Sequence, residues 1–118
     1  ILWAQKADRK AKHLFNYHLM KEQNGGKQMK DVWSGPLTSP KEKTEGKHPT
    51  QKPLYILTRI IEASTVPGAI VLDPFCGSTT GVAAKQLGRR YIGVDREEAY
   101  IELSIKRLKL EDKRNESI

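Results

Sequence analysis

The sequence predicts an α/β fold in which helices flank a parallel sheet. Residues 54–118 divide into stretches with the patterns of a helix, a strand, a helix, a strand and a helix, in that order. This alternation is typical of α/β proteins with a parallel sheet. A glycine-containing turn follows the first strand, and an acidic residue, Asp95, follows the second. Together these features predict a βαβ unit.

The first 47 residues form a separate, more polar region. We expect a strand over 1–6, extended structure over His13–Met20, where apolar and polar residues partly alternate, and a short strand end at Asp31–Trp33. Residues 37–47 consist largely of Pro, Thr, Ser, Lys and Glu, which predicts an exposed, mobile loop. The second predicted region is 48–118.

A helix is predicted from Pro53 to about Ser64. Proline suits the first helical turn, where its missing N–H leaves no hydrogen bond unmade. Leu54, Leu57, Ile60 and Ile61 give this helix an apolar stripe. Val66-Pro-Gly68 then ends the helix and leads into the first strand.

The βαβ unit begins with the apolar run Ala69–Leu72, which has the composition of a buried strand. Asp73-Pro74 ends this strand and Phe75–Gly77 forms a tight turn. Ser78 is the predicted cap of a helix that runs to about Leu87.

Gly88 ends that helix, and the second strand covers Tyr91–Val94. In such units a ligand lies beyond the carboxyl ends of the strands, and an acid about 20 positions after the glycine turn holds a ribose. Asp95 comes 18 positions after Gly77. The pattern predicts a site for a small molecule that contains adenosine.

The last helix is predicted from Glu97 to about Lys113, with a frayed tail over 113–118. Ile101, Ile105 and Leu108 form its apolar stripe. Acidic residues in its first turn suit the helix dipole.

The charge and cysteine content limit the classes of function. Of 118 residues, 21 are Lys or Arg and 14 are Asp or Glu, and residues 1–53 hold 11 of the former against 5 of the latter. This charge is compatible with a polyanionic partner such as nucleic acid and equally with an ordinary solvated, lysine-rich surface. The single Cys76 excludes an internal disulfide framework and fits a reducing cytosol.

Other classes are also excluded. No apolar run approaches the ~20 residues of a membrane span and no signal-peptide pattern is present, so we expect a soluble protein. The three histidines are too scattered to predict a metal site. The chain begins with Ile1 in a strand-like stretch, so we expect it to start inside a larger fold.

Three motifs occur together, in the order His48-Pro-Thr-Gln-Lys-Pro53, Asp73-Pro-Phe-Cys-Gly-Ser78 and Gly93-Val-Asp95. This set resembles the S-adenosylmethionine-dependent DNA amino-methyltransferases, which methylate adenine N6 or cytosine N4. Within them it is similar to the group whose catalytic half precedes the cofactor half. Trp3, Phe15-Asn-Tyr17 and Lys27–Trp33 resemble the stretch that this group places before the first motif.

The resemblance implies a partial Rossmann-like methyltransferase fold with S-adenosylmethionine as cofactor. Asp73–Ser78 would form the turn under the cofactor, Asp95 would accept hydrogen bonds from the ribose, and Phe75 would pack on the adenine or the methionine chain. Thr50 and Lys52 would hold the methionine end. The implied cofactor-binding residues are Thr50, Lys52, Asp73, Phe75, Gly77, Ser78 and Asp95. Taken singly, Asp73 could merely cap a turn, Asp95 could cap the last helix and Lys52 could be solvated.

Double-stranded DNA is the implied partner of the basic first region. The residues offered to its phosphates are Lys6, Arg9, Lys10, Lys12, Lys41, Lys43 and Lys47. Contacts of this kind give an affinity that falls with salt and carries little sequence information.

The sequence departs from the family in two ways. The family's turn usually reads Asp-Pro-Phe-x-Gly-Ser-Gly-Thr-Thr, whereas here Ser78 runs directly into Thr79-Thr80-Gly81. A turn one residue shorter would pull the next helix toward the strand and weaken cofactor binding; a reading error is the alternative. The family's catalytic run, Asp/Asn/Ser-Pro-Pro-Tyr/Phe/Trp, is absent, because the chain contains no Pro-Pro pair.

The missing catalytic run decides what this chain can do. Methylation of an exocyclic amine needs a polar group that orients the amine and an aromatic ring that stacks on the flipped base. Asn16 and Tyr17 are adjacent, but without the prolines we interpret them as a pair of strand residues.

We therefore expect the cofactor-binding part of a site-specific bacterial DNA methyltransferase, cytoplasmic and adenine-directed in preference to cytosine-directed. Its catalytic half would lie upstream, in the same or a separate chain. The alternative is a non-catalytic remnant or subunit that binds DNA or another chain. A nicotinamide-dependent oxidoreductase is disfavoured because Gly-x-Gly-x-x-Gly is absent.

Overall fold

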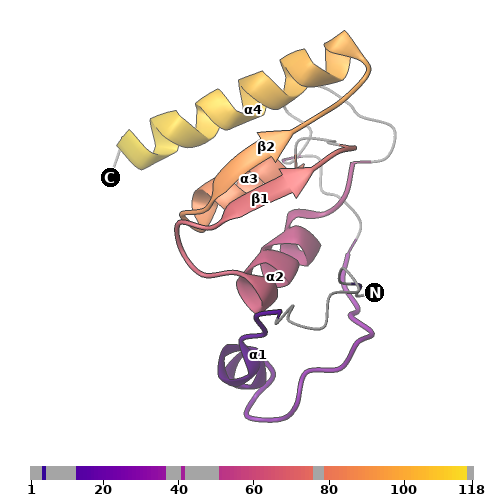
Figure 1. Cartoon of the computed structure of the whole chain (residues 1–118), viewed down its shortest axis with the longest axis vertical. Helices are drawn as coiled ribbons and strands as arrows, with labels where there is room; N and C mark the ends of the chain where they lie inside the picture. Colours follow the sequence, from indigo (N-terminus) through magenta and orange to yellow (C-terminus); the bar gives the residue numbers. More distant parts are fainter. Residues whose placement is uncertain (1–3, 5–12, 37–40, 42–50, 76–78, 117–118) are drawn as a thin grey trace.

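The predicted α-β-α-β-α order is present from Leu54 onward (Figure 1). The structure, a computed structural model, describes residues 4, 13–36, 41, 51–75 and 79–116. The strand expected over 1–6 and the loop expected over 37–47 fall largely outside these residues, and the division at 47/48 stays a prediction. The elements are α1 (Tyr17–Gln23), α2 (Leu54–Ser64), β1 (Ile70–Asp73), α3 (Thr79–Gln86), β2 (Arg90–Gly93) and α4 (Glu98–Glu116).

The two strands pair in parallel and place equivalent residues on the same face. Val71 is in register with Tyr91, and Leu72 is in register with Ile92. Helix α3 connects the strands and lies behind the sheet in Figure 1, with α2 and α4 packed on either side of it. One layer of helices therefore covers one face of this sheet.

The core lies between α3, α2 and the inner face of the sheet. Its centre is made of Ile61, Ala83 and Ala84, and Val71 and Tyr91 pack against it. The small alanine side chains let α3 approach the strands closely. The α2 stripe predicted from the sequence points into this core, since Leu54 and Leu57 also pack there.

The end of α3 has the geometry predicted for Gly88. This residue has a φ of +74°, a conformation that glycine adopts without strain. The backbone N–H of Arg89 donates to the carbonyl of Ala84 over 2.8 Å, as in a Schellman motif. The chain therefore turns at once from α3 into β2.

The prediction that the first strand is buried holds for only one of its faces. Ile70 and Leu72 are 53% and 63% exposed, and Ile92 on the neighbouring strand is 52% exposed. These side chains share the face of the sheet that the described helices do not cover. The apolar composition of the strand predicts burial on both faces of the sheet. The described residues cover only one of these faces.

The predicted apolar stripe of α4 is also wrong in detail. Ile101 and Ile105 are exposed, whereas Leu103 and Arg107 are buried. Helix α4 packs on α3 through a neighbouring and more polar face. Packing on α3, and not the apolar pattern, sets the orientation of α4. It also continues to Glu116 instead of fraying at Lys113, and the cations of its last turn suit the helix dipole.

Two predictions for the first region are wrong. The extended structure predicted over His13–Met20 is wrong from Tyr17 onward, because α1 begins there, and Met20, only 1% exposed, anchors this helix in the fold. Asp31–Trp33 forms no strand; instead the Trp33 indole N–H donates to the Lys30 carbonyl over 2.6 Å. Among the described residues, no helix combines the length and the apolar character needed to cross a membrane.

Asn16 joins the first region to the C-terminal end of α2. Its side-chain amide donates to the carbonyls of Glu62 and Thr65 over 2.6 and 2.9 Å, and its backbone N–H donates to the Ala63 carbonyl over 2.8 Å. Arg89 reaches the same end, donating to the Thr65 hydroxyl and carbonyl over 2.9 Å each. The last carbonyls of a helix have no partner within it, so Asn16 and Arg89 act as an external cap. Asn16 is thus a capping residue, and the interpretation as a strand residue is wrong.

Gly81 is predicted to be irreplaceable although it lies inside a helix. A Cβ atom at Gly81 would lie 2.5 Å from Cε1 of Tyr91. Alanine normally stabilises a helix by about 1 kcal/mol relative to glycine, but here we expect Gly81→Ala to lower the free energy of unfolding by about 1–3 kcal/mol through overpacking. Urea denaturation measures this, with the exposed Gln86→Ala in the same helix as the control. A more stable Gly81→Ala variant would contradict the close contact.

Asn16→Ala is expected to lower the free energy of unfolding by about 1–3 kcal/mol, because it leaves carbonyls of α2 without donors. Asn24→Ala is the matched control, since the exposed Asn24 amide also donates to two carbonyls, those of Lys27 and Gln28. Chemical denaturation of both variants provides the comparison. Equal losses of stability in the two variants would show that the hydrogen bonds of Asn16 contribute no more than those of the exposed Asn24.

Candidate functional site

The candidate site lies at the carboxyl ends of β1 and β2. Asp73 is the last residue of β1, and Asp95 follows β2 by two positions. The Val94 N–H donates to the Asp73 carbonyl over 3.0 Å, which extends the pairing to the very end of the strands. Because the strands are parallel, both carboxylates stand at the same edge of the sheet.

The Asp73 carboxylate organises the turn that leaves β1. Its Oδ1 accepts the backbone N–H of Phe75 over 3.0 Å, and its Oδ2 accepts the hydroxyl of Thr80 over 2.6 Å. The first bond closes a local turn, and the second ties the strand end to the first turn of α3. In this structure Asp73 therefore holds both stems of the predicted cofactor turn.

The Asp95 carboxylate has one oxygen engaged. Its Oδ1 accepts the Glu97 N–H over 2.9 Å just before α4 begins, and the side chain is half-buried. Among the described residues, none donates a hydrogen bond to Oδ2. Asp95 thus shapes the entry to α4 and keeps an acceptor for a further donor.

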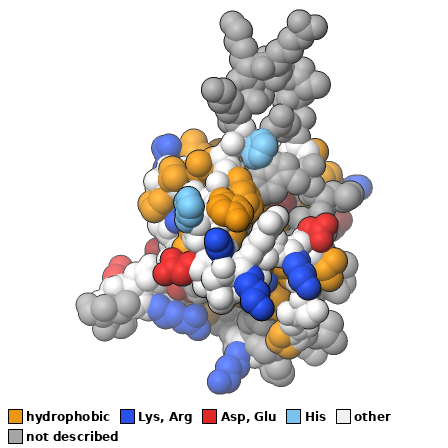
Figure 2. Space-filling model, turned by 90° about the horizontal axis from the view of Figure 1, so that it is seen from below, with side chains coloured by type: hydrophobic (Ala, Val, Ile, Leu, Met, Phe, Trp, Pro, Cys, Tyr) orange, Lys and Arg blue, Asp and Glu red, His pale blue; other side chains and the backbone are white. Residues whose placement is uncertain are grey.

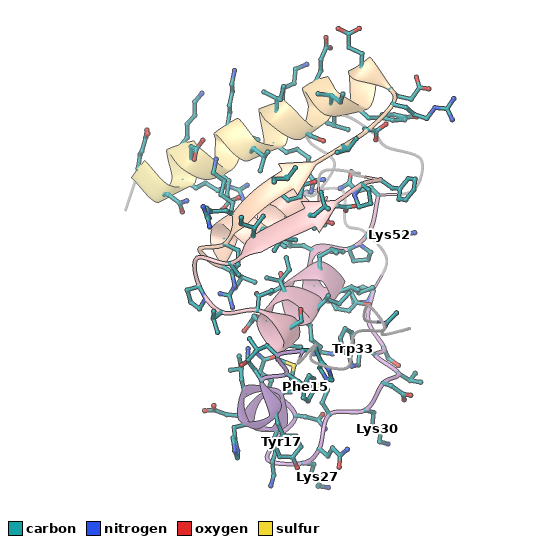
Figure 3. All side chains as sticks on the ribbon, viewed as in Figure 1. Phe15, Tyr17, Lys27, Lys30, Trp33 and Lys52 are labelled. Atoms are coloured by element: carbon teal, nitrogen blue, oxygen red, sulfur yellow. The ribbon has the colours of Figure 1, made fainter. Side chains whose placement is uncertain are left out.

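Phe75 and Lys52 are exposed at the same end of the molecule. Phe75 follows β1 and is 89% exposed. Lys52 comes just before α2, and α2 leads through a short connection into β1, so the start of α2 lies near the end of β1. Figure 3 shows Lys52 on the side toward which the strands point, away from Phe15 and Tyr17. An aromatic ring, a cation and two carboxylates thus gather at one edge.

The remaining predicted site residues lie mostly outside the described residues. This holds for Thr50, Gly77 and Ser78, and of the proposed DNA contacts for Lys6, Arg9, Lys10, Lys12, Lys43 and Lys47. Lys41 is described and exposed. Figure 2, which looks onto the α1 end, shows Lys and Arg side chains interspersed with acidic and apolar ones. On that face the described residues form no concentrated basic patch.

A separate hollow of about 700 Å³ lies at the opposite, amino ends of the strands. Phe15, Tyr17 and Pro67 are among the residues that line it. The Asn16 amide and the Arg89 guanidinium at its wall are engaged with the end of α2. We assign the hollow to the packing of α1 against α2.

The sequence analysis missed two residues next to the site. Thr80 binds Asp73, and Arg107 of α4 donates from Nη1 to the Thr79 hydroxyl over 3.1 Å. The paired threonines at the start of α3 were a usable signal, because hydroxyls favour helix starts. Arg107 was hidden by the expected apolar stripe of α4.

Comparison with known proteins identifies the family. A family model described as DNA methylase (N6_N4_Mtase) matches residues 1–106. The chain is 62% identical over 116 residues to the type II methyltransferase M2.DpnII of Streptococcus pneumoniae, and 62% identical over 109 residues to the type II methyltransferase M2.LlaDCHI of Lactococcus lactis subsp. cremoris. These matches cover 98% and 92% of this chain. The chain spans only 43% and 40% of the length of these relatives.

The fold agrees with that of a solved relative, the M1.HpyAVI–SAM complex. The TM-score is 0.61 at 44% identity, and the match covers 84% of this chain and 45% of that one. The expected partial Rossmann-like methyltransferase fold is confirmed. Together, the family match and these relatives show that the chain belongs to the DNA methylase family.

Proposed function

We propose that the chain is the S-adenosylmethionine-binding part of a site-specific DNA amino-methyltransferase. The observation that carries the proposal is the convergence of Asp73, Asp95, Phe75 and Lys52 at the carboxyl ends of two parallel strands. The relative with 44% identity was solved as a SAM complex, and the type II methyltransferases with 62% identity align over almost the whole chain. These relatives support both the cofactor and the reaction class.

The described side chains fit this cofactor. The Oδ2 of Asp95, to which none of the described residues donates, can accept a ribose hydroxyl, and the exposed ring of Phe75 offers an apolar surface for the adenine or the methionine chain. Lys52 can attract the methionine carboxylate. By resemblance, Thr50 would assist Lys52, and Gly77 and Ser78 would let the turn approach the ligand.

When bound, S-adenosylmethionine supplies a methyl group that its sulfonium already activates, so the protein has to position the reactants. Asp95 and Phe75 orient the nucleoside end and Lys52 orients the amino-acid end. Asp73 keeps the intervening turn in place through Thr80. None of these side chains is assigned to grip the target base.

The residues that bind and orient the target base are proposed to lie in an upstream catalytic half, in the same or a separate chain. The chain contains no Pro-Pro pair and hence no family catalytic run. The exposed face made by Ile70, Leu72 and Ile92 supports a larger fold with a further layer on this face, because parallel sheets are normally covered on both faces. With such a half the target would be an exocyclic amine in double-stranded DNA, adenine in preference to cytosine.

DNA contacts by the basic first region are part of the proposal. Lys6, Arg9, Lys10, Lys12, Lys41, Lys43 and Lys47 would contact phosphates. The alternative for the whole chain is a non-catalytic remnant or subunit, which the absent catalytic run favours.

The cofactor assignment predicts that calorimetry detects S-adenosylmethionine binding and that Asp95→Asn weakens it roughly tenfold, as expected for one hydrogen bond to a charged group. Asp31→Asn, at an exposed loop position, is the control and leaves the affinity unchanged. Absence of binding, both by the chain alone and after addition of an upstream half, would overturn the assignment.

The division of labour predicts that the chain alone transfers no labelled methyl group to DNA. Addition of an upstream half with an Asp-Pro-Pro-Tyr-type motif should restore transfer, and digestion of the DNA to nucleosides should yield N6-methyladenine. Transfer by the chain alone would contradict the missing motif. DNA binding without transfer by the combined halves would favour the non-catalytic alternative.

A further inference from the structure

Arg107 is a buried cation that the cofactor site, as described so far, does not use. Arg107 is only 8% exposed, and its Nη1 donates to the Thr79 hydroxyl over 3.1 Å. Removing a guanidinium from water is unfavourable unless partners compensate. Glu111, one turn later on α4, is also buried, and its carboxylate pairs with Arg114 over 3.5 Å. Packing alone does not explain why the buried contact between α3 and α4 contains the hydrogen bond from Arg107 to Thr79.

The position of Thr79 supplies that explanation. Thr79 is the first residue of α3, is 3% exposed, and directly follows the predicted cofactor turn. Its neighbour Thr80 binds the Asp73 carboxylate at the other stem of the turn. The hydrogen bonds from Arg107 and Thr80 thus fix α3 where the turn ends, one to α4 and one to β1.

Helix α4 has a separate attachment to the far end of α3. Lys85 lies 2.5 Å from the Asp112 carboxylate, and its ammonium group donates to the Leu108 carbonyl over 3.3 Å. This attachment holds the two helices together without contacting the turn. Arg107 is therefore placed to do something that Lys85 does not, namely to fix the helix start that bounds the turn.

We propose that Arg107 is a positioning residue for the methyl-donor site, acting through Thr79 on the start of α3, next to the hydrogen bond between Thr80 and Asp73. A helix start that is already fixed before the ligand arrives loses less conformational entropy on binding. This inference rests on the proposed cofactor function. It assigns Arg107 no contact with the cofactor or with DNA.

The test compares Arg107→Met with Lys85→Met in the full protein. Calorimetry with S-adenosylmethionine should show affinity reduced roughly tenfold for Arg107→Met, the loss expected for one charge-assisted hydrogen bond. Lys85→Met should lower the thermal midpoint and leave the affinity close to wild type. Equal losses of affinity in both variants would overturn the proposal, because they would indicate a general effect of α4 packing.

Variants of Thr79 test whether Arg107 acts through this hydroxyl. Thr79→Val should reproduce the loss seen in Arg107→Met, and Thr79→Ser, which keeps the acceptor, should retain near-wild-type affinity. The double variant Arg107→Met/Thr79→Val should bind no more weakly than either single variant. Additive losses would contradict action through Thr79.

Hydrogen exchange separates this inference from the proposed function. In the ligand-free protein, Arg107→Met should speed exchange in the first turn of α3 and leave α2 unchanged. If the wild-type protein binds no S-adenosylmethionine, the cofactor assignment fails, whereas the exchange pattern still decides whether Arg107 fixes the start of α3. Unchanged exchange at the start of α3 would overturn the inference.

Discussion

The parallel pairing of β1 with β2 is the constraint on which the rest of the described structure depends. Parallel neighbours need a crossover connection, and here α3 is that connection. The crossover brings the backbone of α3 close to the sheet, so Gly81 must accommodate the Tyr91 ring and alanines fill the centre of the core. The same pairing carries Asp73 and Asp95 to one edge. Core packing and site geometry are thus two results of one topology.

The two ends of this unit have different chemistry. At the amino ends of the strands, Asn16 and Arg89 use their donors on the carbonyls that end α2. At the carboxyl ends, Asp95 keeps an acceptor and Phe75 remains almost fully exposed. Polar groups that are already satisfied build structure, whereas available ones can bind. This difference favours the carboxyl edge as the site, although a hollow exists at the opposite end.

The elements that could be predicted from the sequence are those that local patterns determine. Pro53 and Gly88 mark helix boundaries through backbone geometry, and the order from Leu54 to α4 follows from apolar runs. Tertiary contacts decided the rest. Met20 anchors α1 against the alternating pattern, and packing on α3 turns Ile101 and Ile105 of α4 outward. The carboxylates at the strand ends were predictable, whereas Arg107 was not, because its partner Thr79 lies 28 positions away.

The two sides of the sheet differ in where apolar and polar residues lie. Leu72 and Ile92 are exposed on the face of the sheet that the described helices leave open. Arg107 and Thr79 are buried on the helical side, where apolar residues would pack more simply. Exposed apolar area favours association, whereas a buried hydrogen bond mainly fixes geometry. The open face is therefore suited to association with further structure, and the α3–α4 contact is suited to fixing the start of α3.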